Sequence, residues 1–399
     1  MRPDARRTAD RLVAALVSLV VGSACSLAPR EGLYACDPDA RSPACPAGWT
    51  CHRSDSLCWP GAEDAGTEVA DVIDVEPEVD GTGDTTDEVD GEDVGPDDAE
   101  ACSGPERCNE IDDDCDGATD EEIWCAAAAV PSERDLYAVW CDSAEHVWVV
   151  GDRGTILFWN GDAWSAVESG TTANLRGVWS ASADAAWTVG PTPTVLRWDG
   201  LSWTDDAPAV EWTPQDVWGT GPDDVWAVGG PGLVLHRSGG TWTEEPTGVV
   251  MGGRFFGVWG DPGVKVFTVG ENSMIRDREL PAGSWNTRLP PEWMDLFAVV
   301  GASADLVWAV GGVGNILRGP GATWVRVGGP TTNDLRGVWA LSSDAAWAVG
   351  DGGTIVQWNG AVWQEEESGT TAGLKGVWGA PAGELWAVGA TGAILRRRL

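Results

Sequence analysis

The chain has 399 residues, a formal net charge of −38 and 10 cysteines. A charge this negative disfavours binding to nucleic acid or to anionic lipid. The length allows two or three domains, and the composition differs so much between regions that one uniform domain is excluded. About two-thirds of the net charge lies between residues 61 and 122, so the charge marks one region and not the whole chain.

Residues 1–24 have the layout of a signal peptide. Arginines precede an apolar stretch at 12–21, which is too short to span a bilayer that needs roughly 20 apolar residues. Small residues stand directly before Cys25 and resemble the lipobox of bacterial lipoproteins, although that family prefers Leu where Gly22 stands. The resemblance implies cleavage before Cys25 and acylation of this cysteine, and Ser26 implies transport to the outer membrane. Cleavage without acylation, with Cys25 in a disulfide, is the alternative.

All the cysteines precede residue 142, and export to an oxidising compartment would let them form disulfides. The segment 25–60 is predicted to be a small disulfide-rich module, because it is too short to build a hydrophobic core. Four of its cysteines allow three pairings, between which the sequence does not choose: Cys36, Cys45, Cys51 and Cys58. A zinc site is the rival interpretation, but the spacings are wide and include no CxxC pair.

Residues 61–101 are predicted to be a disordered acidic linker. They contain no Lys, no Arg and no aromatic residue, so they cannot bury enough apolar surface to offset the entropy lost on ordering. Repulsion among the carboxylates should extend the segment, which would then act as a stalk for the region that follows.

Residues 102–122 contain the densest cluster of metal-ligand chemistry in the chain. Carboxylates stand at positions 1, 3 and 5 of a loop, and Gly117 at position 6 permits the sharp turn that a calcium loop needs. Ile123 takes position 12, which excludes a helix–loop–helix EF-hand. The predicted ligands are Asp112, Asp114, Asp116, the carbonyl of Ala118, Asp120 and Glu121, with Glu122 or water as alternatives for the last. The competing interpretation is that the segment is only the end of the acidic tract.

The order Cys-Asn-Glu-Ile-Asp-Asp-Asp-Cys-Asp-Gly at 108–117 resembles a metal-binding motif of secreted bacterial proteins. The resemblance extends from Cys102 to Glu121 and implies bound Ca²⁺ and a Cys108–Cys115 bridge that clamps the loop. A copper or zinc role for these cysteines is a weaker alternative.

If Cys25 carries lipid, one of the remaining cysteines is unpaired. Cys141 is the predicted free thiol, and a Cys125–Cys141 bridge is the alternative. The disulfide candidates are Cys36, Cys45, Cys51, Cys58, Cys102, Cys108, Cys115 and Cys125.

From Leu136 onward the sequence repeats a unit of about 40 residues, which is the strongest fold signal in the chain. Each unit contains four short runs rich in Val, Ile and Trp, separated by Gly, Asp, Asn and Thr, and this texture indicates β-strands. The first marker position falls at Trp140, Trp179, Trp218, Trp259, Val300, Trp339 and Trp378. The second falls at Trp148, Trp187, Trp226, Phe267, Trp308, Trp347 and Trp386. Both series predict an all-β fold, a seven-bladed β-propeller over residues 123–399.

The seventh unit stops after its third strand. In the other units a tryptophan of the fourth strand precedes the next unit's first marker: Trp164, Trp203, Trp242, Trp285, Trp324 and Trp363. Trp124 stands in the same relation to Trp140, so residues 123–125 are predicted to supply the missing strand and close the ring.

These units resemble the propellers of the sialidase-type BNR group and of the photosystem II assembly and stability factor group. The resemblance lies in Gly-Val-Trp, Trp-Ala-Val-Gly and Gly-x-x-Trp. The units differ from WD40 repeats, since no Gly-His and Trp-Asp pair recurs, and from kelch repeats, since Gly-Gly doublets occur only in some units. The likeness implies the fold and says little about function. The recurring tryptophans are predicted to be core residues and not sugar-binding surfaces.

One position varies while its neighbours do not, the residue after the leading Leu of each unit. If the first strand of each unit lines the axis, these side chains form a ring near one mouth of the channel. The ring consists of Tyr137, Arg176, Gln215, Phe256, Phe297, Arg336 and Lys375. Three cations and three aromatic rings there could hold an acidic or glycan ligand, but a variable rim without a ligand is the favoured interpretation.

The sequence predicts no catalytic residues and no enzyme. Catalysis needs a nucleophile, an acid/base pair or a metal. The predicted propeller contains only one tyrosine, Tyr137, and two histidines, His146 and His236. The Ser-x-Asp-x-Gly-x-x-Trp box of sialidases is absent.

The predicted function is a non-catalytic binding or scaffold lipoprotein at the outer membrane or cell surface of a Gram-negative bacterium, with secretion as the alternative location. Its expected partner is an extracellular protein or glycan and not nucleic acid, and we expect a monomer that touches the membrane only through lipid. A glycan-active hydrolase or lyase at the channel mouth and a purely structural surface protein are the alternative functions.

Overall fold

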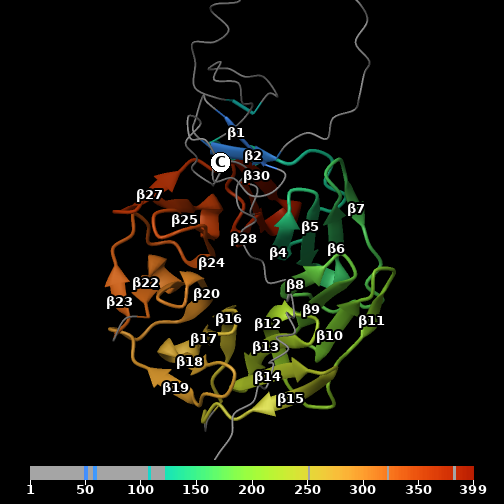
Figure 1. Cartoon of the computed structure of the whole chain (residues 1–399), viewed down its shortest axis with the longest axis vertical. Coiled ribbons are helices and arrows are strands. Elements are labelled where there is room, and N and C mark those ends of the chain that lie inside the picture. Colours follow the sequence, from blue (N-terminus) through green and yellow to red (C-terminus); the bar gives the residue numbers. More distant parts are fainter. Residues whose placement is uncertain are drawn as a thin grey trace, which may run out of the picture.

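The computed structural model describes residues 49–52, 57–60, 107–108, 122–249, 252–320, 323–380 and 383–399. From residue 122 onward these residues form a ring of seven four-stranded antiparallel sheets, the blades of a propeller (Figure 1). The first strand of each blade lies innermost and faces the central axis (Figure 1). The prediction of an all-β, seven-bladed propeller is therefore confirmed.

The blades are numbered in chain order. Blade 1 contains β4 (Leu136–Ser143), β5 (His146–Gly151), β6 (Ile156–Trp159) and β7 (Trp164–Ala166). Blade 2 contains β8 (Gly177–Ser182), β9 (Ala185–Gly190), β10 (Thr194–Trp198) and β11 (Trp203–Asp205). Blade 3 contains β12 (Thr213–Gly221), β13 (Asp224–Gly230), β14 (Leu233–Ser238) and β15 (Thr241–Glu245). Blade 4 contains β16 (Phe255–Asp261), β17 (Lys265–Gly270), β18 (Ile275–Glu279) and β19 (Trp285–Arg288).

Blade 5 contains β20 (Leu296–Ser303), β21 (Leu306–Gly311), β22 (Ile316–Gly319) and β23 (Val325–Val327). Blade 6 contains β24 (Leu335–Ala340), β25 (Ala346–Gly350), β26 (Ile355–Trp358) and β27 (Trp363–Glu366). Blade 7 contains β28 (Leu374–Ala380), β29 (Glu384–Gly389), β30 (Ile394–Arg398) and β3 (Cys125–Ala126). Short 3₁₀ turns follow the second strand in five blades: η1 (Asp152–Gly154), η2 (Glu271–Ser273), η3 (Gly312–Gly314), η4 (Asp351–Gly353) and η5 (Ala390–Gly392). Outside the ring, β1 (Trp49–His52) and β2 (Leu57–Pro60) pair as an antiparallel hairpin.

The second strand of each blade is the most deeply buried, because a neighbouring blade packs on each face of the sheet. In β9 every residue is buried, which explains why these strands are continuous runs of Trp, Ala, Val and Gly without the polar alternation of a half-exposed strand. The indoles of these strands pack edge-to-face on the next blade, as in the contact of Trp148 with Trp203, whose ring centroids are 5.3 Å apart. The recurring tryptophans are thus core residues, as predicted.

Blade 7 is built from both ends of the described chain, as predicted, although the closing strand β3 is Cys125–Ala126 and not residues 123–125. The backbone of β3 pairs with β30, with Cys125 opposite Arg396, and the N–H of Ala127 donates to the carbonyl of Ile394 at 2.8 Å. Trp124 is buried and its Nε1 donates to Glu366 of blade 6 at 2.7 Å. Without β3, β30 would be the outer edge strand of this blade and free to pair with another chain.

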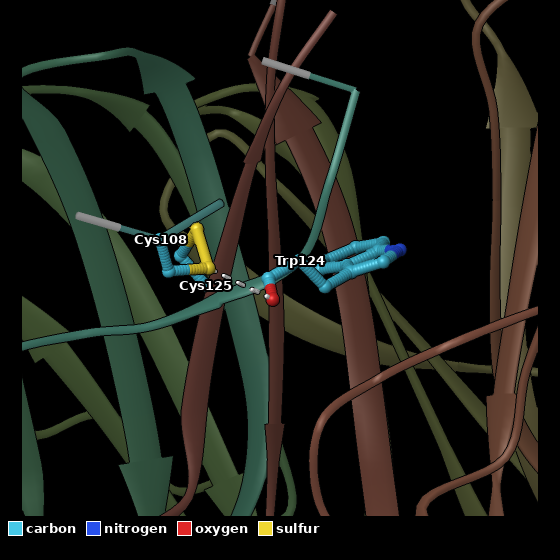
Figure 2. Close-up of a disulfide and its surroundings, with 3 residues drawn as sticks. All are labelled: Cys108, Trp124 and Cys125. Carbon is cyan, nitrogen blue, oxygen red and sulfur yellow. Dashed lines mark hydrogen bonds between the residues drawn. A yellow bond between two sulfur atoms is a disulfide. The ribbon is translucent and has the colours of Figure 1, made fainter. Parts of the chain in front are cut away.

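A disulfide joins Cys108 to Cys125, directly beside this closing strand (Figure 2). The Cα atoms of the two cysteines are 5.4 Å apart, and Sγ of Cys108 lies 3.5 Å from the carbonyl oxygen of Trp124. The Cys108–Cys115 pairing that the metal-motif resemblance implied is therefore wrong in this structure, as is the Cys125–Cys141 alternative. Cys125 is brought to Cys108 because β3 turns along the edge of β30. Cys141 is a buried free thiol in β4, as predicted.

Several predictions lie outside the described residues. They are the signal peptide with Cys25, the side chains and pairing of the cysteines in 25–60, the acidic linker at 61–101 and the calcium loop at 112–121. Within the described part of the chain, no helix is long and apolar enough to cross a membrane.

Candidate functional site

The predicted ring lies at bulges in the inner strands. In six blades the pairing register between the first and second strands shifts across the ring residue, as between Leu136 and Ala138 around Tyr137. A bulge residue has no partner in the ladder, so its side chain can turn away from the sheet. In blade 2 the inner strand begins directly after Arg176. This local geometry directs the variable residues toward the axis.

All seven ring side chains line one cavity of about 150 Å³ on the axis, as the sequence predicted for their position. The ring side chains also contact one another. The Arg176 guanidinium and the Lys375 ammonium lie 4.2 and 4.4 Å from the centroid of the Tyr137 ring, and Arg336 lies 4.5 Å from that of Phe297. Cations at such distances over an aromatic face are attracted by its negative π surface. Cation–aromatic contacts therefore join side chains of neighbouring blades at the channel mouth.

Carboxylates that the sequence analysis did not assign to the mouth pair with two of its three cations. Lys375 Nζ lies 2.6 Å from Asp135, a residue of the next blade, and Arg336 Nη2 lies 2.9 Å from Asp334 and 3.0 Å from Asp351. The hydrogen bond from Lys375 lowers the pKa of Asp135, and the hydrogen bond to Asp351 raises the pKa of Arg336. The ring is thus less cationic than its own seven residues indicate.

Tyr137 donates its hydroxyl to Asp152 of η1 at 2.7 Å. Burial, with this hydrogen bond and the nearby carboxylates, raises the pKa of Tyr137 to about 12. The phenol is therefore a neutral hydrogen-bond donor near neutral pH and not a nucleophile.

Arg176 differs from the other two cations of the ring. Among the described residues no carboxylate lies within 4.0 Å of its guanidinium, and its buried Nε has no hydrogen-bond partner. Its neighbour in the ring, Gln215, is neutral and donates to the Thr213 carbonyl at 3.3 Å. The ring side chains that can still bind a ligand's acceptor atoms are therefore those of blades 2 and 3.

Asp216 is the functional candidate that the sequence analysis missed. It follows Gln215 and lines the same cavity, at a position that is Gly or Ala in the other six blades. Its Oδ1 accepts the N–H of Val217 at 2.9 Å, and its Oδ2 accepts the N–H of Val258 in blade 4 at 3.0 Å. Burial raises the pKa of Asp216 to about 7, against the smaller opposite effect of these two bonds. The departure from the Gly/Ala series was the available sequence signal.

Other polar groups of the propeller lie away from this cavity. His146 bonds to Asp142 at 2.9 Å and His236 to Asp224 at 2.6 Å, and neither histidine lines the axial cavity. Within the described residues no group of three or more His, Cys, Asp or Glu side chains could hold a metal ion. The predicted calcium ligands lie outside that part of the chain.

Neither a protein-family profile nor a curated protein sequence matches this chain. Solved structures do match the propeller. YCF48 from Cyanidioschyzon merolae is 19% identical with a TM-score of 0.58, and the match covers 69% of this chain and 99% of that one. A structure of YCF48 bound to D1 peptide is 17% identical with a TM-score of 0.58, covering 71% and 97% of the two chains. Virginiamycin B lyase from Staphylococcus aureus is 13% identical with a TM-score of 0.60, covering 69% and 99%. At these identities the likeness shows only that the chain shares the propeller fold of YCF48 and of virginiamycin B lyase.

Proposed function

We propose that the protein is a non-catalytic binding module whose channel mouth receives one anionic or hydrogen-bonding group of an extracellular protein or glycan. The observation that carries the proposal is the axial cavity, which all seven ring side chains line. Its volume of about 150 Å³ lies below the roughly 300 to 1,000 Å³ of small-molecule sites. A cavity of this size has room for one side chain of a partner protein or one substituent of a sugar. It suits the insertion of such a group better than the enclosure of a whole substrate.

Arg176 is the anchor of this site. The other two cations of the mouth already bind carboxylates, whereas the Arg176 charge is free of such a partner among the described residues. An incoming carboxylate or sulfate would therefore displace no ion pair at Arg176. The rings of Phe256 and Phe297, whose centroids are 5.7 Å apart, offer an apolar wall in the same cavity.

The groups that line the cavity argue for binding and against catalysis. Tyr137 is a neutral phenol held by Asp152, and both oxygens of Asp216 accept backbone N–H groups. A propeller neighbour that was solved with a bound peptide supports the binding role by analogy, and the lyase neighbours share only the fold. A glycan-active hydrolase or lyase is the weaker candidate.

The test is the substitution Arg176→Gln, with Arg326→Gln on the outer strand of blade 5 as the matched control. The mature chain is applied to arrays of acidic, neutral and basic peptides and of sulfated, sialylated and neutral glycans. A hydrogen bond to a charged group contributes about 1.5–3 kcal/mol, so binding to anionic probes should fall about 10- to 100-fold in Arg176→Gln only. Equal binding by both variants, or no binding by the wild-type chain, would count against the proposal.

The location and the metal belong to the same proposal. A lipid on Cys25 and an extended acidic stalk would hold the propeller beyond the outer membrane. Mass spectrometry of the protein from membranes should find an acylated chain that begins at Cys25. Bound Ca²⁺ at Asp112, Asp114 and Asp116 should raise the melting temperature, because a ligand of the folded form alone stabilises it. A melting temperature equal in Ca²⁺ and in chelator would contradict the calcium loop.

A further inference from the structure

Seven repeated blades allow each junction between neighbours to be compared with the other six. At four junctions a residue of the 3₁₀ turn, held at positive φ, donates its N–H to a side chain just before the next inner strand. The bonds run from Arg153 to Asn174 (3.0 Å), from Asn272 to Asp295 (2.8 Å), from Val313 to Asp334 (2.8 Å) and from Thr391 to Asp135 (3.0 Å). These bonds tie each turn to the following blade on the face that carries the channel mouth.

The junctions that follow blade 2 and blade 3 have neither the 3₁₀ turn nor the side-chain acceptor of this hydrogen bond. Pro191-Thr192-Pro193 and Gly230-Pro231-Gly232 replace the 3₁₀ turns, and Thr213 and Arg254 replace the acceptors. At the remaining junction, from blade 6 to blade 7, the turn is kept and only the acceptor is missing, at Gly373. The junctions that follow blades 2 and 3 therefore lack a contact that four other junctions have.

A groove lies along the turns of blades 2 and 3. It has a volume of about 650 Å³ and runs from the turn of blade 2 to the start of blade 4. Pro191, Pro193 and Pro231 line it, together with Trp212, which is only 4% exposed and whose indole N–H has no partner among the described residues. The lining is therefore mostly apolar, and its three prolines present no N–H donors.

Arg254 is the cation of this groove. Its side chain is 47% exposed, and its nearest carboxylate, Glu271, lies 3.9 Å away, at the outer limit of an ion pair. The guanidinium also lies 6.0 Å from the centroid of Phe256, which lines the axial cavity. Arg254 thus lies between the groove and the Phe256 side of the channel mouth.

We propose that this groove binds an extended segment of a partner protein, with a carboxylate of the segment on Arg254 and an apolar side chain against the prolines. The proposal rests on the binding function proposed above and specifies its partner as a protein. A glycan is disfavoured because sugars stack on exposed aromatic faces, and the one indole of the groove is buried. Glu211 also lines the groove, so the segment carries a single carboxylate in a mainly apolar context and not an acidic run.

Selection of a phage-displayed random twelve-residue library on the full mature chain tests the proposal. Peptides enriched on the wild-type chain should contain one Asp or Glu among Pro, Leu and aromatic residues. Synthetic versions of these peptides should bind the Arg254→Glu variant at least tenfold more weakly than they bind the wild type. Replacing the acidic residue of the peptide by Lys should restore its affinity for the Arg254→Glu variant. The control Arg326→Glu should bind as the wild type does.

The outcomes separate this inference from the proposed function. Peptides that lose affinity with Arg176→Gln but not with Arg254→Glu would overturn the groove and leave binding at the mouth intact. Loss with Arg254→Glu that the charge-reversed peptide restores would support the groove, since a merely unfolded variant could not be rescued. Enrichment of no peptide on the wild-type chain would overturn the inference, whereas the glycan arrays would still test the mouth.

Discussion

Glu366 of blade 6 accepts a hydrogen bond from Arg397 at 2.8 Å, and its other oxygen accepts one from Trp124 at 2.7 Å. Arg397 lies in β30 and Trp124 directly precedes β3, so one carboxylate holds the two strands that close the ring. The guanidinium of Arg397 also lies over the ring of Trp347, 5.8 Å from its centroid.

The positions of Glu366 and Arg397 vary together at six of the seven junctions, and at the junction of blades 4 and 5 they are Arg288 and Gly319. An acidic residue three positions after the fourth-strand tryptophan accompanies an arginine in the third strand of the next blade: Asp206 with Arg237, Glu245 with Arg278, and Glu366 with Arg397. An apolar residue there accompanies a tryptophan: Ala127 with Trp159, Val167 with Trp198, and Val327 with Trp358. A guanidinium stacks on the preceding blade's aromatic ring as an indole does, but its buried charge also needs a carboxylate.

The first prediction concerns the replacement of the carboxylate–arginine pair by an apolar residue and a tryptophan. Glu366→Val leaves the buried guanidinium of Arg397 unpaired and should lower the free energy of unfolding by about 3 kcal/mol. Adding Arg397→Trp recreates the pairing of Val327 with Trp358 and should restore at least half of the loss, with the rest due to the missing acceptor of Trp124. Urea unfolding measures both, with the exposed Glu367→Val as control. A double variant no more stable than Glu366→Val would disprove the equivalence.

The second prediction concerns pH. Because burial raises the pKa of Asp216 from 3.8 to about 7, the folded chain binds this proton more tightly than the unfolded chain. The resulting stabilisation is present below about pH 4 and is lost as the pH rises to about 7, a change on the order of 4 kcal/mol. Asp216→Ala, the residue of blades 1 and 5, should remove this dependence. Urea unfolding from pH 4 to 8 should show the variant gaining stability relative to the wild type, and a constant difference would contradict the assignment.

The third prediction concerns the disulfide. Cys108 and Cys125 are 17 residues apart, and a loop of this size gives about 3 kcal/mol of stabilisation through the unfolded state. Cys108→Ala, Cys125→Ala and the double variant should each lose about this amount. The two losses should not add, because either substitution breaks the same bond. Amide exchange of β30 should become faster in all three variants. Additive losses in urea unfolding would show that the cysteines act separately.

The fourth prediction concerns the close approach of neighbouring inner strands. A Cβ added at Gly301 of blade 5 would lie 2.5 Å from the ring of Trp259 in blade 4, which is nine-tenths buried. Gly301→Ala should therefore cost about 1–3 kcal/mol through overpacking. Gly221→Ala is the matched control, since nothing lies within 4 Å of its added Cβ. Equal melting temperatures for the two variants would show that the indole moves aside freely.

The sequence by itself determined the number of blades, their strand order and the strand that closes blade 7. One tryptophan recurs at nearly constant spacing in the first, second and fourth strands, because each blade repeats the same contacts with its neighbours. The position of the ring followed for the same reason, since six ring residues stand at equivalent bulges and Arg176 directly precedes its inner strand.

Only the tertiary structure decided what the ring can bind. Asp135, just before β4 of blade 1, pairs with Lys375 of blade 7, and Asp216 bonds to Val258 of the next blade. The partner of Cys125 was likewise set by the path of β3 along β30. Spacing within a repeat shows which residues are equivalent, whereas charge pairing and burial depend on side chains that different blades bring together. The repeat therefore predicts the scaffold, and the exceptions to the repeat define the candidate site.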